Sequence, residues 1–209
     1  MTFSVWLSLL AACVVISLTP GAGAINTMSN SLTEGWRRSV WGVIGQQLAL
    51  IVYIVIVAAG VGLLVSHFPI LFEVVRYAGA AYLVFLGVRL ILVKTDAEDP
   101  TQENFTPRGE SRWSMVRRGF WVNILNPKAV IFFLAFMPQF VRLDQPQLPQ
   151  YFIVSVTMVV VDVVVMWLVF AGAAGPFRRL TRTPRGRRSI NSVFGALFIL
   201  VAVLLLFMH

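Results

Sequence analysis

The sequence predicts an all-α, polytopic membrane protein whose six transmembrane helices form two inverted three-helix repeats. Its composition is 58% hydrophobic and only 12% charged, which is too apolar for a water-soluble domain. Apolar runs of about 20 residues, the length that crosses a bilayer, recur between short polar joints. The first run and the fourth are each interrupted by a proline, so the first helix of each repeat is expected to be broken.

The first span contains the first interruption. Its apolar part ends in the motif Ser-Leu-Thr-Pro-Gly at residues 17–21, and a segment of small residues follows. Pro20 lacks a backbone donor and Gly21 is a weak helix former, so these two residues predict a break. A cleaved signal peptide is the alternative reading, because Ala-Gly-Ala at 22–24 imitates a cleavage site. No Lys or Arg precedes Arg37, however, and a signal peptide carries its positive charge ahead of the apolar core.

The other spans lie in two groups around one hydrophilic stretch. Span four is interrupted at Asn126-Pro127-Lys128, and Pro69 suits the start of span three. The expected spans are 3–31, 40–66, 70–93, 113–140, 149–175 and 189–208. We therefore divide the single membrane domain into a first half (1–94), a cytoplasmic linker (95–112) and a second half (113–209).

The cationic residues predict how the protein is oriented. Cytoplasmic loops retain Lys and Arg near helix ends, and here the loops after spans one, three and five hold most of them. The opposite side holds only Arg76 and Arg142, so both termini are expected on the non-cytoplasmic side. The cations that set this orientation are Arg37, Arg38, Arg89, Lys94, Arg108, Arg112, Arg117, Arg118, Arg178, Arg179, Arg182, Arg185, Arg187 and Arg188.

Several kinds of chemistry are disfavoured. The net charge of +8 is spread over loops without interleaved aromatic residues, so it indicates lipid headgroups rather than nucleic acid. Cys13 is the single cysteine, which excludes an intrachain disulfide and a thiolate metal site. His67 and His209 lack metal-ligand spacing, and we predict no metal site. Neither a GxSxG nor an HExxH motif is present, so an intramembrane enzyme is not expected.

The two interruptions predict a binding site between the halves. Breaks at corresponding positions of two halves are typical of inverted-repeat transporters, which hold their substrate between half-helix ends near the bilayer midplane. The start of a half-helix presents free N–H groups that suit a carboxylate. An ordinary proline kink in each span is the alternative. The candidate substrate-binding residues are Pro20, Gly21, Asn126, Pro127 and Asp162.

Lys128 and Asp162 are the ionisable residues that lie well inside apolar runs, and both are expected to face the interior. Asp162 could bind a substrate ammonium or a coupling proton, and Lys128 would balance its charge. The alternative is a structural Lys128–Asp162 pair without a role in transport. Four amide side chains could line a polar pathway or satisfy the freed backbone at the breaks, and the sequence does not choose between these roles: Gln46, Gln47, Asn26 and Asn123.

These motifs resemble those of the lysine exporter and homoserine/threonine resistance (LysE/RhtB) family. The resemblance rests on Ser-Leu-Thr-Pro-Gly at 17–21, Asn-Ile-Leu-Asn-Pro-Lys-Ala at 123–129, Phe-Phe-x-x-Phe-x-Pro-Gln-Phe at 132–140 and the segment 79–87. It implies efflux of amino acids or their derivatives across the bacterial inner membrane, driven by proton exchange and without a bound cofactor. Ala22 departs from the Pro-Gly-Pro that the family commonly has at the first break, which leaves the substrate open.

The function predicted is thus export of an amino acid or a related small zwitterion by a protein embedded in the lipid bilayer. A membrane scaffold or channel-like protein is the alternative, since small-residue packing such as Ala58-x-x-x-Gly62 suits either class. Faces of small residues also make a homodimer plausible.

Overall fold

The structure is a computed structural model that describes residues 1–67, 69–93, 109–142, 144–181 and 183–207. Within these ranges every regular element is a helix. Four helices are long and apolar enough to cross a membrane, and there are six spans if each of two bent helix pairs counts as one. The predicted all-α membrane fold with two broken helices is confirmed. Most of the expected linker lies outside the described residues.

The first half begins with a broken helix and continues with two long ones. Helix α1 (Phe3–Leu18) starts where the Thr2 side chain accepts a hydrogen bond from the Val5 N–H. Helix α2 (Ala22–Glu34) follows Pro20 and Gly21 and is bent by 58° from α1. Helices α3 (Trp36–His67) and α4 (Pro69–Leu92) complete the half, and α4 starts at the proline that the sequence indicated.

The second half repeats the break but departs from regular α-helix in two places. Helix α5 (Arg112–Ile124) and the helical stretch that starts at Pro127 meet at a bend of 56°. This stretch consists of α6 (Pro127–Ile131), the π-helix η1 (Phe132–Phe136) and the 3₁₀-helix η2 (Met137–Phe140). Helix α7 (Gln147–Val163) continues as the π-helix η3 (Val164–Ala171). Helices α8 (Ala174–Thr181) and α9 (Pro184–Phe207) follow.

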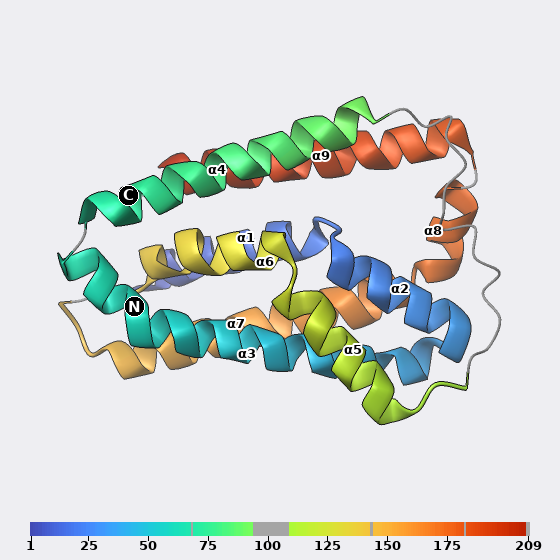
Figure 1. Ribbon diagram of the computed structural model, residues 1–209, viewed down its shortest axis with the longest axis horizontal. Helices are drawn as coiled ribbons and strands as arrows, with labels where there is room; N and C mark the ends of the chain where they lie inside the picture. Colours follow the sequence, from blue (N-terminus) through green and yellow to red (C-terminus); the bar gives the residue numbers. More distant parts are fainter. Residues whose placement is uncertain (68, 94–108, 143, 182, 208–209) are drawn as a thin grey trace.

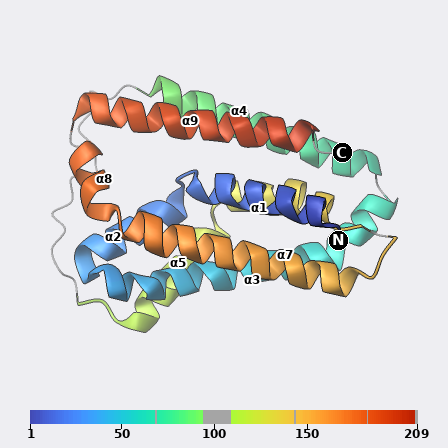
Figure 2. The same cartoon turned by 180° about the vertical axis from the view of Figure 1, so that it is seen from behind.

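Figures 1 and 2 show α4 and α9 side by side as an outer pair, with α1 and α6 between this pair and the remaining helices. Glycines allow the closest contacts. A Cβ on Gly87 of α4 would lie 2.7 Å from the Gly195 carbonyl oxygen of α9. Where α3 crosses α5, a Cβ on Gly45 would collide with the Val116 carbonyl oxygen, and one on Gly119 with the Gly42 carbonyl oxygen. These two crossings therefore hold their backbones in direct contact.

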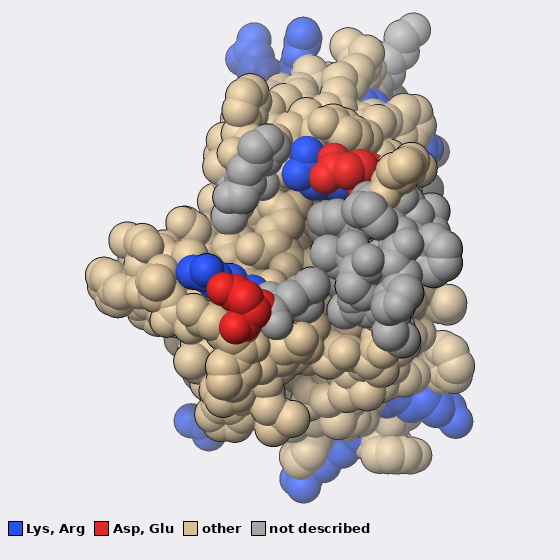
Figure 3. All heavy atoms as spheres, turned by 90° about the vertical axis from the view of Figure 1, so that its left-hand side faces the viewer, with Lys and Arg blue, Asp and Glu red and all other residues tan. Residues whose placement is uncertain are grey.

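The two ends of the bundle differ in charge. Both termini lie at one end, and α8 lies across the other (Figure 1). The end with α8, which we call the arginine-rich end, also has the starts of α3, α5 and α9 with their arginines. At the end with the termini, Arg142 pairs with Asp144 at 2.9 Å and Arg76 with Glu73 at 3.0 Å. Figure 3, a view onto this end, shows two small groups of mixed charge on a largely uncharged surface.

Candidate functional site

The second break is closed by side chains of its own half and of α3. Asn126 caps α6, because its Oδ1 accepts a hydrogen bond from the Lys128 N–H at 3.1 Å. The Tyr53 hydroxyl of α3 donates to the Ile124 carbonyl at 2.5 Å, and the Asn123 amide donates to the Gln46 carbonyl at 3.0 Å. The Lys128 N–H and the Ile124 carbonyl at this break thus find protein partners, as a break inside a membrane requires, and the Asn123 amide fastens α5 to α3.

The first break is closed by a side chain from the other half. Lys128 Nζ donates to the carbonyl oxygens of Ile16 at 3.1 Å and Thr19 at 2.6 Å, at the end of α1. An ammonium group is favourable there, because the C-terminal end of a helix carries partial negative charge. A Cβ on Gly21 would lie 3.4 Å from Lys128 Cε and 3.6 Å from Asn126 Nδ2. The two breaks therefore lie against one another.

The start of α2 differs from the start of α6. Gly21 occupies the capping position of α2 and has no side chain to bond the first N–H groups. The first turn of a helix leaves such N–H groups without partners inside the helix. Gly23 and Ala24 in the first turn of α2 line a cavity. This helix start is consequently available to a ligand with an acceptor group.

Asp162 of α7 is held by two donors from the first half. Ser17 Oγ donates to its Oδ1 at 3.1 Å, and Gln47 Nε2 donates to its Oδ2 at 2.7 Å. No ion pair of the described residues joins Asp162 to Lys128. The direct Lys128–Asp162 contact that the sequence allowed is absent, and each residue has its own set of hydrogen-bond partners.

Both charged residues face one cavity of about 60 Å³ between the halves. A cavity of this size holds several water molecules. Its apolar wall contains Phe132, Phe133, Met158 and Met166. Its polar wall is formed by the following side chains: Ser17, Gln46, Asn123, Asn126, Lys128 and Asp162. The cavity therefore offers a cation, an anion and amides in an otherwise apolar membrane domain, which suits a small zwitterion.

Most of the residues predicted from the sequence come together here. Gln46, Asn123, Asn126, Lys128 and Asp162 line the cavity, Gln47 contacts Asp162, and Gly21 lies beside Lys128. Pro20 and Pro127 form the breaks. Asn26 does not line the cavity, because its amide lies near Gly42 of α3. Gln46 also satisfies backbone, since its Nε2 donates to the Gly23 carbonyl at 3.1 Å and to Thr27 Oγ1 at 3.0 Å.

Sequence reasoning missed four residues of the site. Ser17 donates to Asp162, the Thr19 carbonyl accepts from Lys128, Thr27 contacts Gln46, and Cys13 lines the cavity. Ser17 and Thr19 belong to the motif that marks the first break, which is the only signal that pointed to them. Within the described residues, no cluster of His, Cys, Asp or Glu could hold a metal ion.

Two broken spans that meet at a charged cavity define a secondary transporter. The LysE type translocator family matches residues 14–209 of the chain. The chain is 39% identical over 205 residues to the homoserine/homoserine lactone efflux protein of Salmonella typhimurium, with 98% of this chain and 97% of the relative covered. The protein of the same name from Salmonella typhi is 38% identical over the same length and coverage.

An uncharacterized membrane protein of Vibrio cholerae is 34% identical over 205 residues, with 98% of each chain covered. No solved structure matches the chain. The family match and the full-length similarity show that this chain belongs to the LysE type translocator family. It is accordingly a membrane efflux transporter of amino-acid-like metabolites and not an enzyme.

Proposed function

We propose that this protein exports homoserine and closely related amino acids by alternating access. The observation that carries the proposal is the cavity in which Lys128 and Asp162 stand apart, each held by its own partners. A direct ion pair would leave neither charge available to a zwitterion. The choice of substrate rests on the two Salmonella relatives, which are named for efflux of homoserine and homoserine lactone.

In this proposal the substrate carboxylate binds at the first break. The uncapped start of α2, the Asn126 amide and the Lys128 ammonium all point donors at this region. Lys128 stays bonded to the end of α1 and contributes its charge across the break. A carboxylate is well stabilised by a helix start combined with a nearby cation.

The substrate ammonium binds Asp162. Ser17 and Gln47 orient the two carboxylate oxygens and leave lone pairs free toward the cavity. In the emptied carrier a proton can take the place of the substrate ammonium on Asp162, so Asp162 is also the proposed site of proton coupling. Homoserine lactone has the ammonium but no carboxylate, and its binding depends on Asp162 alone.

The orientation with both termini outside the cytoplasm and the location in the bacterial inner membrane belong to the same proposal. The arginine-rich end then faces the cytoplasm, in agreement with the retention of Lys and Arg on that side. An exporter takes its substrate from this end and releases it at the end that carries the termini.

The proposal is tested by efflux from cells loaded with homoserine-containing dipeptides, with all amino acids and homoserine lactone followed in the medium. Cells with the protein should release homoserine faster, and an uncoupler should abolish the difference. Asp162→Asn should lose this release at unchanged membrane abundance, while the control Asp144→Asn, a surface carboxylate, should keep it. Equal release with and without abundant wild-type protein would refute the proposed substrate.

A further inference from the structure

One face of α2 is polar from the cavity to the arginine-rich end. Gly23 lines the cavity, and Asn26, Asn30 and Glu34 follow at intervals of three and four residues, which places them on one side of the helix. Asn26 is 8% exposed and Asn30 is fully buried. The amide nitrogens of both side chains have no hydrogen-bond partner.

Buried donors without partners are unfavourable, and they are rare in folded proteins. Arg118 of α5, which contacts Asn30, also has a buried Nε without a partner. The three atoms are all donors, so the group that would satisfy them is an acceptor. A carboxylate, which offers two acceptor oxygens, fits this requirement.

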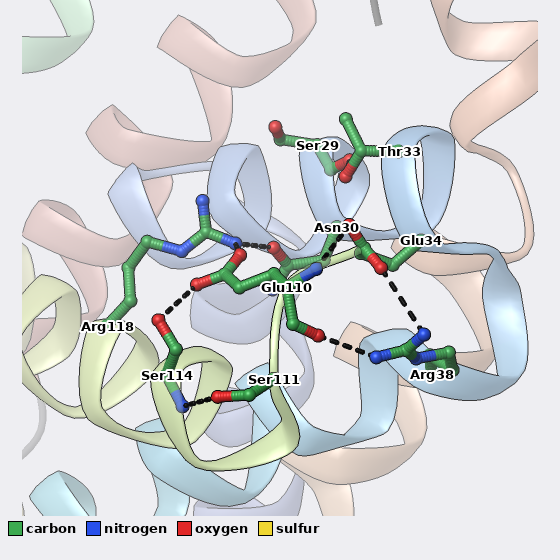
Figure 4. Close-up of polar contacts among 9 residues, drawn as sticks. All are labelled: Ser29, Asn30, Thr33, Glu34, Arg38, Glu110, Ser111, Ser114 and Arg118. Carbon is green, nitrogen blue, oxygen red and sulfur yellow. Dashed lines mark hydrogen bonds and ion pairs between the residues drawn. The ribbon is translucent and has the colours of Figure 1, made fainter. Parts of the chain in front are cut away.

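A polar network closes this face of α2 at the arginine-rich end (Figure 4). Arg118 donates to Asn30 Oδ1 and, at 2.6 Å, to Glu110 Oε2. Ser114 donates to the other oxygen of Glu110 at 2.7 Å. The Glu110 N–H donates to Glu34 Oε1 at 3.1 Å. The network therefore ties α2 of the first half to α5 of the second half.

The contacts around this network differ in how easily they can separate. The backbones of α3 and α5 touch at the glycine crossing, so these two helices form a fixed pair. At this end α2 is held instead by two hydrogen bonds, one from Arg118 to Asn30 and one from the Glu110 N–H to Glu34. The Arg118–Glu110 ion pair lies within the second half and orients Arg118. A Cβ on Gly42 would collide with the Asn30 amide, which shows that nothing fits between Asn30 and α3 in this conformation.

We propose that the α2 face bearing Asn26 and Asn30 is the substrate path between the arginine-rich end and the cavity, and that the Asn30–Arg118–Glu110 contact is its closed gate. When α2 moves away from α5, Arg118 and the two amides bind the carboxylate of the incoming substrate. The identity of the ligand rests on the proposed function, whereas the position of the gate does not.

The gate is tested with Cys13, which lines the cavity and is the single cysteine of the chain. Inside-out membrane vesicles are treated with a small, charged methanethiosulfonate reagent, and the rate of Cys13 modification is measured. Losing a charged hydrogen bond should favour the open gate by about tenfold, so Arg118→Gln should be modified about tenfold faster than wild type. Arg117→Gln, which changes the exposed neighbouring arginine, should react at the wild-type rate.

Asn30→Ala provides a second variant, should Arg118→Gln fail to accumulate in the membrane. It removes the acceptor on α2 for the Arg118 hydrogen bond and should also accelerate modification. The sidedness of the vesicles is calibrated with Arg185→Cys in a Cys13→Ser background, because Arg185 is exposed at the arginine-rich end. Wild-type rates in the accumulating gate variants would overturn the proposed gate.

The path is tested with the two substrates named by the relatives. Asn26→Leu, which leaves the gate residue Asn30 in place, should raise the homoserine concentration for half-maximal export by about tenfold, the value of one lost charged hydrogen bond. Export of homoserine lactone, which has no carboxylate, should change little, and Ser29→Ala on α2 should alter neither substrate. Equal effects on both substrates would overturn the carboxylate path. If wild type exports neither substrate, the proposed function fails while the Cys13 measurement still decides the gate.

Discussion

The two broken spans have nearly equal bends, 58° and 56°, but they are completed in different ways. The second break supplies its own cap, Asn126, and needs only hydrogen bonds from nearby amide and hydroxyl groups. The first break has no cap on α2, and its α1 carbonyls are bonded by Lys128 from the other half. The two bends are alike, whereas the chemistry at the two breaks is not.

This difference indicates that the two breaks have different roles, one in holding the halves together and the other in binding a ligand. At the second break the Lys128 N–H bonds Asn126 and the Ile124 carbonyl bonds Tyr53 of α3, so this break links the two halves and positions Lys128. The first break has no side-chain cap at the start of α2, which lies beside the cavity, so it is the part of the pair that is open to a ligand. The following changes test the comparison.

The largest effect is expected from Lys128→Met, which removes the donor that joins the breaks. The Ile16 and Thr19 carbonyls would lose their partner inside the membrane domain. We expect a loss of about 3 kcal/mol in the free energy of unfolding, together with loss of export. Thermal unfolding in detergent and efflux from the same cells measure both. A stable, active variant would mean that the Lys128 bonds are not required at the first break.

A smaller effect is expected from Asn126→Ala, which removes the cap of α6. Loss of such a cap costs about 1 kcal/mol. Export should fall but not disappear, because Lys128 and Asp162 remain. Asn126→Asp should restore stability, since its carboxylate also accepts from the Lys128 N–H, and should still weaken homoserine export because it repels the substrate carboxylate. Full recovery of export by Asn126→Asp would exclude the amide from carboxylate binding.

Gly21→Ser should separate stability from transport at the first break. The added hydroxyl can cap α2 and should raise stability by a few tenths of a kcal/mol relative to Gly. The same cap would occupy the N–H groups proposed for the carboxylate, so homoserine export should fall more than lactone export. Parallel changes for the two substrates in the efflux assay would contradict a carboxylate site at this helix start.

The smallest effect is expected from Asp144→Asn. Asp144 pairs with Arg142 at the surface, where both side chains are more than half exposed, 63% and 52%. The hydrogen bond from Arg142 lowers the pKa of Asp144 below its usual value, but water screens the pair. Export and thermal unfolding should therefore match wild type, in contrast to Asp162→Asn. A marked loss of export would show that the outer ion pair takes part in transport.

The features predicted correctly from the sequence depend on neighbouring residues. Pro20-Gly21 and Asn126-Pro127 break their helices through local backbone chemistry, which needs no information about distant residues. The partners of Lys128 could not be predicted in this way. The sequence shows acidic side chains but not which carbonyl groups a break will expose. Asp162 was therefore the one partner that sequence reasoning could offer for Lys128.

The features missed depend on packing between distant segments. The π-helix at 164–171 follows an apolar run that reads as ordinary α-helix. In the fold, the ring of Trp167 in this π-helix stacks on the Trp36 ring, with 4.8 Å between the ring centroids. The Trp36 indole N–H donates to the Trp167 carbonyl at 3.0 Å, and the Trp167 indole N–H donates to the Trp36 carbonyl at 3.2 Å. Likewise, Ser17 becomes a partner of Asp162 only when α1 packs on α7.

The outer pair of α4 and α9 bears on how the protein is made. During synthesis α4 enters the bilayer before α9 emerges from the ribosome. Until then the close surface around Gly87 has no Gly195 to meet, and α4 can pack only on segments that precede α9, such as the one with Ile131 and Ala135. The outer pair therefore forms later than the contacts between α4 and the second broken span.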